Sequence, residues 1–200
     1  MKHAIKYSIG IICTLVLLVP VAAAQRDRVE RQQPEKLLDI AGIKPGMIVG
    51  EAGCGDGFLT FFISRRVGDK GHVYANDISS DALGRLNERR RREGITNITT
   101  VLGEVDDPSY PVKDIEVITM IYAFHDFTEK AVWLKNVKKY LKPGAALYVF
   151  DAHDSHTGMS EELVKKLGDE AGFKVTRCEE IHGGLWVYVL TERDNTTKKN

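Results

Sequence analysis

The sequence predicts an α/β fold with a mostly parallel sheet that ends in an antiparallel hairpin. Three observations lead to this prediction. Short apolar runs alternate with longer helical patterns along residues 34–191. A glycine-rich turn joins an early apolar run to a helical pattern. The last two apolar runs, residues 173–181 and 185–191, are joined by a short turn with two glycines, which is typical of a hairpin.

Length and composition are those of one soluble globular domain. The 200 residues can bury a full core, with 43% apolar and 28% charged residues. The formal net charge is zero, so composition gives no reason to expect a nucleic-acid partner. The run Arg89–Arg92 lies between Glu88 and Glu93, and we interpret it as the solvated face of a helix.

The N-terminus predicts a secretory signal peptide over residues 1–24. Lys2 and Lys6 precede an apolar run, and small residues follow it up to Ala24. We therefore expect a periplasmic or secreted protein. The alternative is an uncleaved anchor that keeps the protein at a membrane. The apolar stretch of residues 9–24 is shorter than the roughly 20 residues that a membrane span needs.

The first elements after this segment lead to the glycine-rich turn. Residues 25–33 are polar and predict a linker. Pro34 favours the start of a short helix over residues 34–41, and Gly42 favours its end. A Pro-Gly turn then precedes a buried strand at residues 47–51, and a helix is expected over residues 57–66.

The turn between that strand and helix holds glycines at three alternate positions. Glycine lets a backbone turn tightly and lie close to a ligand. The turn lacks the lysine of a phosphate-binding loop, and its third glycine comes one residue too early for a dinucleotide-binding turn. Glu51 and Asp56 would repel a pyrophosphate and attract a cationic group. A turn that binds no ligand is the alternative interpretation.

The pattern of Glu51 followed by Gly53, Gly55 and Gly57 resembles motif I of the class I S-adenosylmethionine (SAM)-dependent methyltransferases. The resemblance covers about residues 34–191. It implies a Rossmann-like three-layer sandwich, with a mostly parallel seven-stranded sheet and a C-terminal antiparallel hairpin. SAM is then the expected cofactor, and its ammonium and sulfonium groups suit the acidic residues of the turn.

The second strand, residues 71–77, ends at an acidic residue. Asp77 lies 20 residues beyond the third glycine, where a carboxylate can accept hydrogen bonds from a ribose diol. Ile78 is assigned to the same cofactor site. A helix cap is the alternative role for Asp77, but Ser79 and Ser80 can serve as caps of the following helix, residues 81–93. Both SAM and NAD folds use such an acid, so Asp77 does not distinguish them.

The third strand, within residues 95–102, leads to the predicted adenine site. The resemblance implies that Glu104 accepts a hydrogen bond from the exocyclic amine of adenine, and that the Val105 N–H donates to the ring. Only residues 106–113 separate this loop from the next strand. We therefore expect the helix that the family has at this point to be missing or reduced.

The fourth strand, residues 115–121, is nearly continuous in apolar residues, as expected for a strand covered on both faces. Asp114 stands where the family often has an aspartate. The segment Tyr122–Phe127 follows and should face the reacting centre, because ligands bind beyond the carboxyl ends of parallel strands. Tyr122 is expected beside the methyl group of the cofactor.

Methyl transfer mainly requires positioning of the acceptor, and a base only if the acceptor must lose a proton. The candidates are His125, Asp126, Asp151 and His153. We assign His125 and Asp126 as catalytic, with His125 first because histidine exchanges protons near neutral pH. A hydrogen-bonded histidine that only supports the site is an equally weighted alternative.

The remaining elements complete the predicted sheet. A helix over residues 129–141, capped by Asp126 or Thr128, should be followed by a turn at residues 142–144 and a strand at residues 145–150. Another helix is expected between Ser160 and Gly172, and residues 192–200 form a polar tail.

The run Asp151–His156 holds two aspartates and two histidines, which suggests a metal site as one alternative. The family members that bind magnesium have an asparagine after the acid of the fifth strand, where this chain has Ala152. We predict no metal, and a polar loop beside the acceptor. The fold that the resemblance implies places Cys54 and Cys178 too far apart for a disulfide.

The sequence thus predicts a SAM-dependent methyltransferase with a small-molecule methyl acceptor as its partner. A non-catalytic SAM-binding protein would have the same cofactor residues. An NAD-dependent oxidoreductase is a further alternative, which the glycine spacing and the acids of the turn disfavour.

Overall fold

The computed structural model describes residues 26–153 and 159–193. The predicted signal peptide, Asp154 to His156 of the polar loop and residues 194–200 of the tail lie outside the described residues. Within the described ranges, every helix is too short or too polar to cross a lipid bilayer.

The chain divides into two units, residues 1–37 and residues 38–200, and each is described by itself. In the first unit, residues 26–32 are helical, inside the segment interpreted as a linker. Its arginine, glutamate and glutamine residues are good helix formers, so polarity alone does not indicate an extended linker. Helix α2 (Pro34–Ile40) begins at proline, as predicted.

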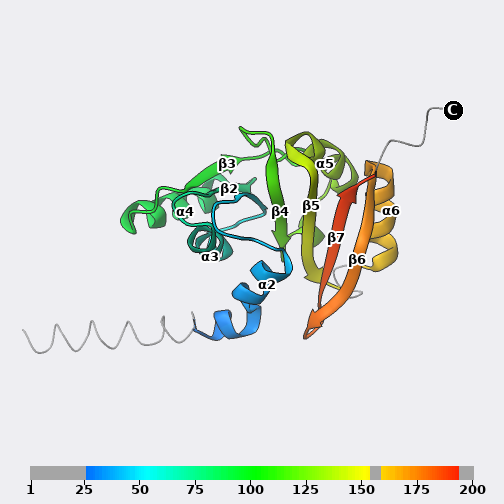
Figure 1. Ribbon diagram of the computed structural model, residues 1–200, viewed down its shortest axis with the longest axis horizontal. Helices are drawn as coiled ribbons and strands as arrows, with labels where there is room; N and C mark the ends of the chain where they lie inside the picture. Colours follow the sequence, from blue (N-terminus) through cyan, green and yellow to red (C-terminus); the bar gives the residue numbers. More distant parts are fainter. Residues whose placement is uncertain (1–25, 154–158, 194–200) are drawn as a thin grey trace, which may run out of the picture. The chain divides into compact units, whose positions relative to one another are not determined.

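The second unit contains one seven-stranded sheet, which Figure 1 shows with most of its strands labelled. The strand order is β3-β2-β1-β4-β5-β7-β6. The first five strands pair in parallel, whereas β7 pairs antiparallel with both β5 and β6. The strands are β1 (Ile48–Ala52), β2 (His72–Asp77), β3 (Ile98–Leu102), β4 (Ile115–Ile121), β5 (Leu141–Ala152), β6 (Phe173–His182) and β7 (Leu185–Glu192). The predicted parallel sheet with a terminal hairpin is confirmed.

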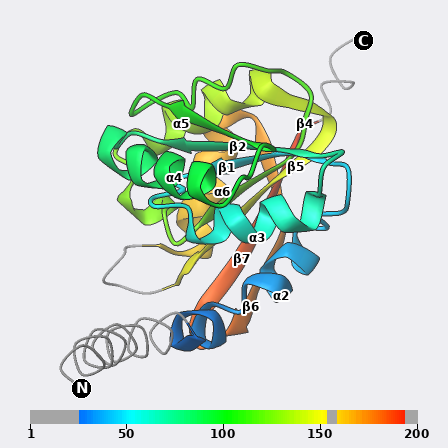
Figure 2. The same cartoon turned by 90° about the vertical axis from the view of Figure 1, so that its left-hand side faces the viewer.

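Four helices and two short 3-10 turns accompany the sheet (Figure 2). They are α3 (Phe58–Val67), α4 (Ser80–Arg92), α5 (Lys130–Val137), α6 (Glu161–Ala171), η1 (Phe124–Asp126) and η2 (Lys138–Tyr140).

Neighbouring residues of β1 show that helices cover both faces of the sheet, because successive side chains of a strand point in opposite directions. The Glu51 carboxylate accepts a hydrogen bond from the hydroxyl of Thr60 in α3. Ala52 belongs instead to an apolar cluster that includes Trp133 of α5 and Val164 of α6. The predicted three-layer α/β sandwich is therefore confirmed.

The region from α5 to β5 differs from the prediction. Helix α5 ends at Val137 and continues as η2, and β5 already begins at Leu141, which pairs with Ile115. The predicted turn at residues 142–144 is replaced by an irregular segment of β5. The pairing with β4 jumps from Leu141 to Ala146, and Gly144 lies in this jump with φ +80°.

The predicted cap of α5 is also wrong. Glu129 is the N-cap, and its side chain makes no capping hydrogen bond. Asp126 instead lies in η1. The cap of α6 agrees with the prediction, because Ser160 accepts a hydrogen bond from the Leu163 N–H.

The connection from β3 to β4, residues 103–114, contains no helix, as predicted. Contacts with α5 and η2 hold this loop in place. Asn136 donates to the Asp106 carbonyl at 2.9 Å, and the Tyr140 hydroxyl donates to the Asp107 carboxylate at 2.7 Å. Burial tends to raise the pKa of Asp107, but hydrogen bonds from Lys139 and Tyr140 lower it overall. The loop is therefore anchored without a helix of its own.

The two cysteines of the described chain are free, as expected. Cys54 is buried in the glycine turn, and Cys178 is half-buried on β6.

Candidate functional site

A cavity of about 300 Å³ lies beyond the carboxyl ends of β1, β2 and β4. Seven of its lining residues were candidates from the sequence, and they come from four separate segments. The lining residues are Gly53, Asn76, Asp77, Ile78, Glu104, Val105, Tyr122, Ala123, Asp126, Phe127, Thr128 and Trp133. The predicted cofactor residues of the strand ends thus meet in one place.

Two positions of the turn require glycine because a side chain there would clash with a neighbouring residue. Gly53 has φ +71°, and a Cβ there would lie 2.5 Å from the Cβ of Ala123. Gly57, the N-cap of α3, has φ +85°, and a Cβ there would lie 2.8 Å from the Leu86 side chain. Gly53 lines the cavity, whereas Gly55, Asp56 and Gly57 of the same turn are not among its lining residues.

Asp77 is held in place by two backbone donors. Its Oδ2 accepts from the Gly55 N–H at 2.8 Å, and its Oδ1 accepts from the Ser79 N–H at 2.9 Å. Ser79 itself caps α4 by accepting from the Ala82 N–H. A carboxylate has about four lone-pair sites, so each Asp77 oxygen keeps capacity for a further donor. The carboxylate is thus oriented at the cavity wall and can still accept from a diol.

Glu51 lies below the glycine turn and does not line the cavity. Its side chain is buried, and Oε2 accepts a hydrogen bond from the Thr60 hydroxyl at 2.6 Å. Burial, with smaller contributions from Asp77 and Asp56, raises the pKa of Glu51 from 4.5 to about 8. A cation bound near the turn would favour its ionised form.

We expect Glu51→Gln to remove a pH-dependent loss of stability. Because burial raises the pKa of Glu51 in the folded state, its stabilising contribution is complete below pH 4.5 and is lost as the pH rises toward about 8. This loss amounts to about 3 kcal/mol between roughly pH 5 and pH 7.5. Glutamine cannot ionise and can still accept from Thr60. Urea unfolding of both proteins without SAM should show curves that diverge as the pH rises; parallel curves would contradict the assignment.

Asn76 was not identified from the sequence. It is a buried polar residue of β2, and its amide donates to the Val101 carbonyl at 3.2 Å and to the Pro108 carbonyl at 2.8 Å. A Cβ at Gly103 would lie only 2.3 Å from that amide nitrogen. Asn76 therefore fixes the loop that carries Glu104. An amide beside Asp77 in an otherwise apolar strand was the signal for it.

Apolar side chains are exposed at this cavity. Ile78 is 62% exposed and Val105 is 52% exposed, and both line the cavity. Burying them against the flat apolar face of a ligand would be favourable. Together with the Glu104 carboxylate, they suit the adenine site that the resemblance implies.

The other end of the cavity is formed where β4 ends. Tyr122 has φ +52°, which is uncommon for a residue with a side chain, and its N–H donates to the Phe150 carbonyl at 2.8 Å. This bend brings Ala123 against Gly53 and leads into η1. The strained residue thus lies where the chain turns toward the cavity, as is common at functional sites.

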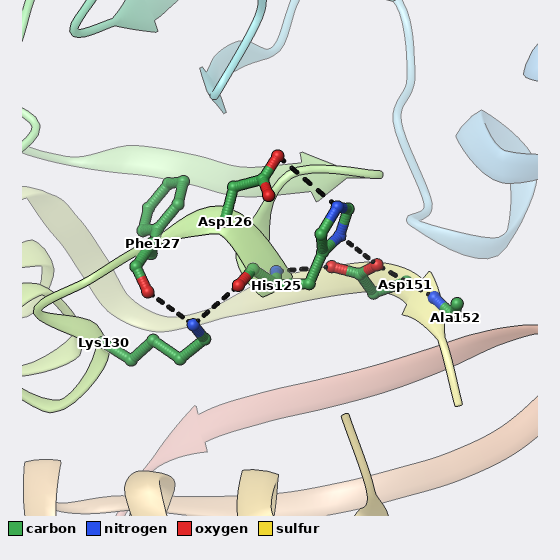
Figure 3. A network of polar contacts seen from close by, with 6 residues as sticks. All are labelled: His125, Asp126, Phe127, Lys130, Asp151 and Ala152. Carbon is green, nitrogen blue, oxygen red and sulfur yellow. Dashed lines mark hydrogen bonds and ion pairs between the residues drawn. The ribbon is translucent and has the colours of Figure 1, made fainter. Parts of the chain in front are cut away.

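His125 and Asp151 form a hydrogen-bonded pair, shown in Figure 3. The His125 ring atom Nδ1 lies 2.7 Å from Asp151 Oδ1, and the backbone N–H of His125 donates to Asp151 Oδ2 at 2.9 Å. Asp151 is fully buried and also accepts from the Ala152 N–H. An ionised carboxylate only accepts hydrogen bonds, so this pairing makes Nδ1 the donor and leaves Nε2 to accept a proton. Nε2 faces Asp126 Oδ2 at 3.4 Å.

Lys130 holds the turn that carries His125. Its ammonium donates to the His125 carbonyl at 2.8 Å and also to the Phe127 carbonyl (Figure 3). Burial lowers the pKa of Lys130, while the nearby Asp151 and Asp126 oppose that shift. The roles of Lys130 and of Asp151 as a histidine partner were not identified from the sequence, because they depend on contacts that only the fold creates.

The other base candidate, His153, is engaged elsewhere. Its Nδ1 lies 2.9 Å from the Tyr188 hydroxyl, and its ring stacks on Trp186 with 4.4 Å between centroids. His153 does not line the cavity. Among the described residues, no three histidine, cysteine or acidic side chains gather into a group that could hold a metal ion.

The chain matches the model of a protein family described as "Methyltransferase domain" over residues 43–193. Among curated proteins, it is 30% identical over 139 residues to the ubiquinone/menaquinone biosynthesis C-methyltransferase UbiE of Shewanella sp. (strain W3-18-1). That match covers 69% of this chain and 54% of the relative. The chain therefore spans about half the length of the curated relatives that it matches.

Solved structures of methyltransferases are also similar to this chain. A SAM-dependent methyltransferase from Aquifex aeolicus is 30% identical, with a TM-score of 0.72 over 82% of this chain and 92% of the other. A SAM-dependent O-methyltransferase from Thermotoga maritima is 12% identical, with a TM-score of 0.62 over 82% of this chain and 66% of the other. This second likeness concerns the fold alone.

Proposed function

Because the chain belongs to the class I SAM-dependent methyltransferase family, we propose that it transfers the methyl group of SAM to a small-molecule acceptor that loses a proton to His125. The observation that carries this proposal is the His125–Asp151 pair beside the cavity. A protein that only binds SAM does not need a histidine whose free nitrogen is oriented by a buried carboxylate.

The residues around the cavity could bind a cationic ligand that contains a nucleoside, such as SAM. Asp77 would accept from the ribose hydroxyls, and Glu104 from the exocyclic amine of adenine. The backbone N–H of Val105 would donate to the ring, and the turn from Gly53 to Gly57 would approach the amino-acid end. Carboxylates on the wall and in the turn favour a positively charged ligand over a pyrophosphate. The NAD alternative is accordingly not retained.

SAM supplies, when bound, a methyl group on a sulfonium, which is already a good leaving group. The protein therefore has two tasks, alignment of the acceptor and removal of its proton. Tyr122 and η1 lie where they would align the acceptor. His125 Nε2 would take the proton, and Asp151 would hold the ring and balance the charge that develops on it.

When bound, SAM would supply the methyl group and keep the electron pair of its carbon–sulfur bond on sulfur. The residues of the chain would then have to accept only the proton of the acceptor. The proton of the acceptor is transferred to His125 and then passes to solvent, because the His125 side chain is 26% exposed.

The acceptor class rests on the relatives and on the small cavity. The curated relatives are named for ubiquinone and menaquinone biosynthesis, which concerns small molecules, but they are about twice as long as the matched region. The neutral net charge gives no reason to propose nucleic acid as a partner.

We also propose export through the predicted signal peptide, with membrane anchoring as the alternative if that segment is not cleaved.

The proposal is tested by incubating the full chain with SAM and a panel of small hydroxy-arenes, amines and thiols. Mass spectrometry should detect S-adenosylhomocysteine together with one methylated product. SAM binding without any product would favour the non-catalytic SAM-binding alternative and would contradict the proposal.

A further inference from the structure

Part of the cavity wall combines aromatic rings with a negative charge. Tyr122, Phe127 and Trp133 line the cavity together with Asp126, and the proposed function assigns the acceptor to this part. Phe127 packs edge-on against Trp133, with 5.2 Å between ring centroids. Such rings provide flat apolar walls of the kind that bury an aromatic ligand.

Three carboxylates line the cavity, and two of them, Asp77 and Glu104, are already assigned to the cofactor. Asp126 therefore remains for the acceptor. Its side chain is 82% exposed, and Oδ2 lies 3.4 Å from the His125 nitrogen that would accept the proton. No lysine or arginine is among the described residues that line the cavity.

Lys130 acts electrostatically on Asp126, but it does not line the cavity. Lys130 directs its ammonium onto the carbonyl oxygens of His125 and Phe127. Figure 3 shows Lys130 on one side of the η1 turn and the Asp126 carboxylate on the other. An anionic group on the acceptor would therefore meet the Asp126 carboxylate at the cavity wall, with no lysine or arginine among the described lining residues.

We infer that Asp126 is a specificity-determining residue that excludes anionic acceptors, so that the site takes uncharged hydroxy-arenes. This inference rests on the proposed function. A carboxylate on the acceptor would be repelled by Asp126, and repulsion against the wrong ligand is a common source of specificity. The same charge disfavours binding of a phenolate. The acceptor thus enters in its protonated form, which explains why the site holds His125 as a base.

The test compares matched acceptors with the full chain and SAM. Catechol is paired with protocatechuate, and hydroquinone with gentisate, since each pair differs by one carboxylate. We expect the neutral member to have a kcat/KM higher by about tenfold, as for two like charges several ångströms apart in a partly hydrated site. The preference should shrink as salt screens the charges.

Asp126→Asn has nearly the same shape without the charge, and it should reduce the preference to about twofold or less. Glu129→Gln is the matched control, because it removes a charge from an exposed residue three positions away that does not line the cavity. This control should keep the wild-type preference.

Three results would overturn the inference while leaving the proposed function intact. The first is equal methylation of both members by the wild type, and the second is an undiminished preference in Asp126→Asn. The third is a preference lost equally in Glu129→Gln, since the charge effect would then not belong to Asp126. Failure to methylate any member of either pair would count against the hydroxy-arene class. If the wider panel also gave no product, the proposed function itself would fail.

Discussion

Replacing Asp77 with alanine is expected to weaken SAM binding by about 100-fold or more. The ribose hydroxyls would lose two hydrogen bonds to a charged acceptor, each worth about 1.5–3 kcal/mol, and every 1.4 kcal/mol is about tenfold in affinity. The Asp77 carboxylate is also fixed by the Gly55 and Ser79 N–H groups, so little reorganisation accompanies binding. Calorimetric titration of both proteins with SAM measures the difference.

The alanine variant also leaves those two N–H groups without their partner, which could destabilise the turn. Asp77→Asn serves as the control, because it keeps the size of the side chain and one acceptor oxygen. We expect both its SAM affinity and its melting temperature to fall between those of the wild type and the alanine variant, because the amide NH2 cannot accept from one of the two N–H groups. An unchanged SAM affinity in the alanine variant would remove Asp77 from the cofactor site.

Replacing His125 with asparagine is expected to lower kcat by about 100- to 10,000-fold, the range that a positioned general base contributes. The asparagine amide can still donate to the buried Asp151 carboxylate, so the pair remains satisfied, but no nitrogen can accept the proton. SAM affinity should stay within about twofold, because His125 is not among the residues proposed to bind SAM. Single-turnover rates together with SAM titrations separate the two effects.

Asp151→Asn tests the same pair from the other side. An amide at position 151 has only one acceptor oxygen, so it cannot accept from both the backbone N–H and the ring Nδ1–H of His125. The imidazole then loses its fixed tautomer. We expect a fall in kcat similar to that of His125→Asn, and no additive effect in the double variant. Full activity of His125→Asn would instead assign His125 a purely structural role, the alternative left open by the sequence.

The arrangement of the sheet could be predicted from the sequence because each pattern that indicates it is local. The glycine turn, the acid at the end of β2 and the hairpin glycines are short patterns with direct backbone consequences. Ser160 as the cap of α6 is of the same kind. Seven of the predicted site residues meet at one cavity, because the carboxyl ends of parallel strands lie on one edge of a sheet.

Features that depend on packing were not predictable. Asp151 meets His125 across 26 positions of the chain, and no local pattern indicates that pairing. The early start of β5 at Leu141 depends on pairing with Ile115, after which Pro143 and Gly144 lie in a jump of the pairing register. Glu51 was predicted to contact the cofactor, but it lies in β1, buried against Thr60 of α3, and does not line the cavity.

The central claim is that this cavity binds SAM for methyl transfer. Calorimetric titration of the full chain with SAM and, separately, with NAD tests it most directly. We expect SAM to bind with a dissociation constant in roughly the micromolar range, typical of enzyme substrates, and NAD to give no heat of binding. Binding of NAD in place of SAM, or no binding of SAM by the folded protein, would contradict the account.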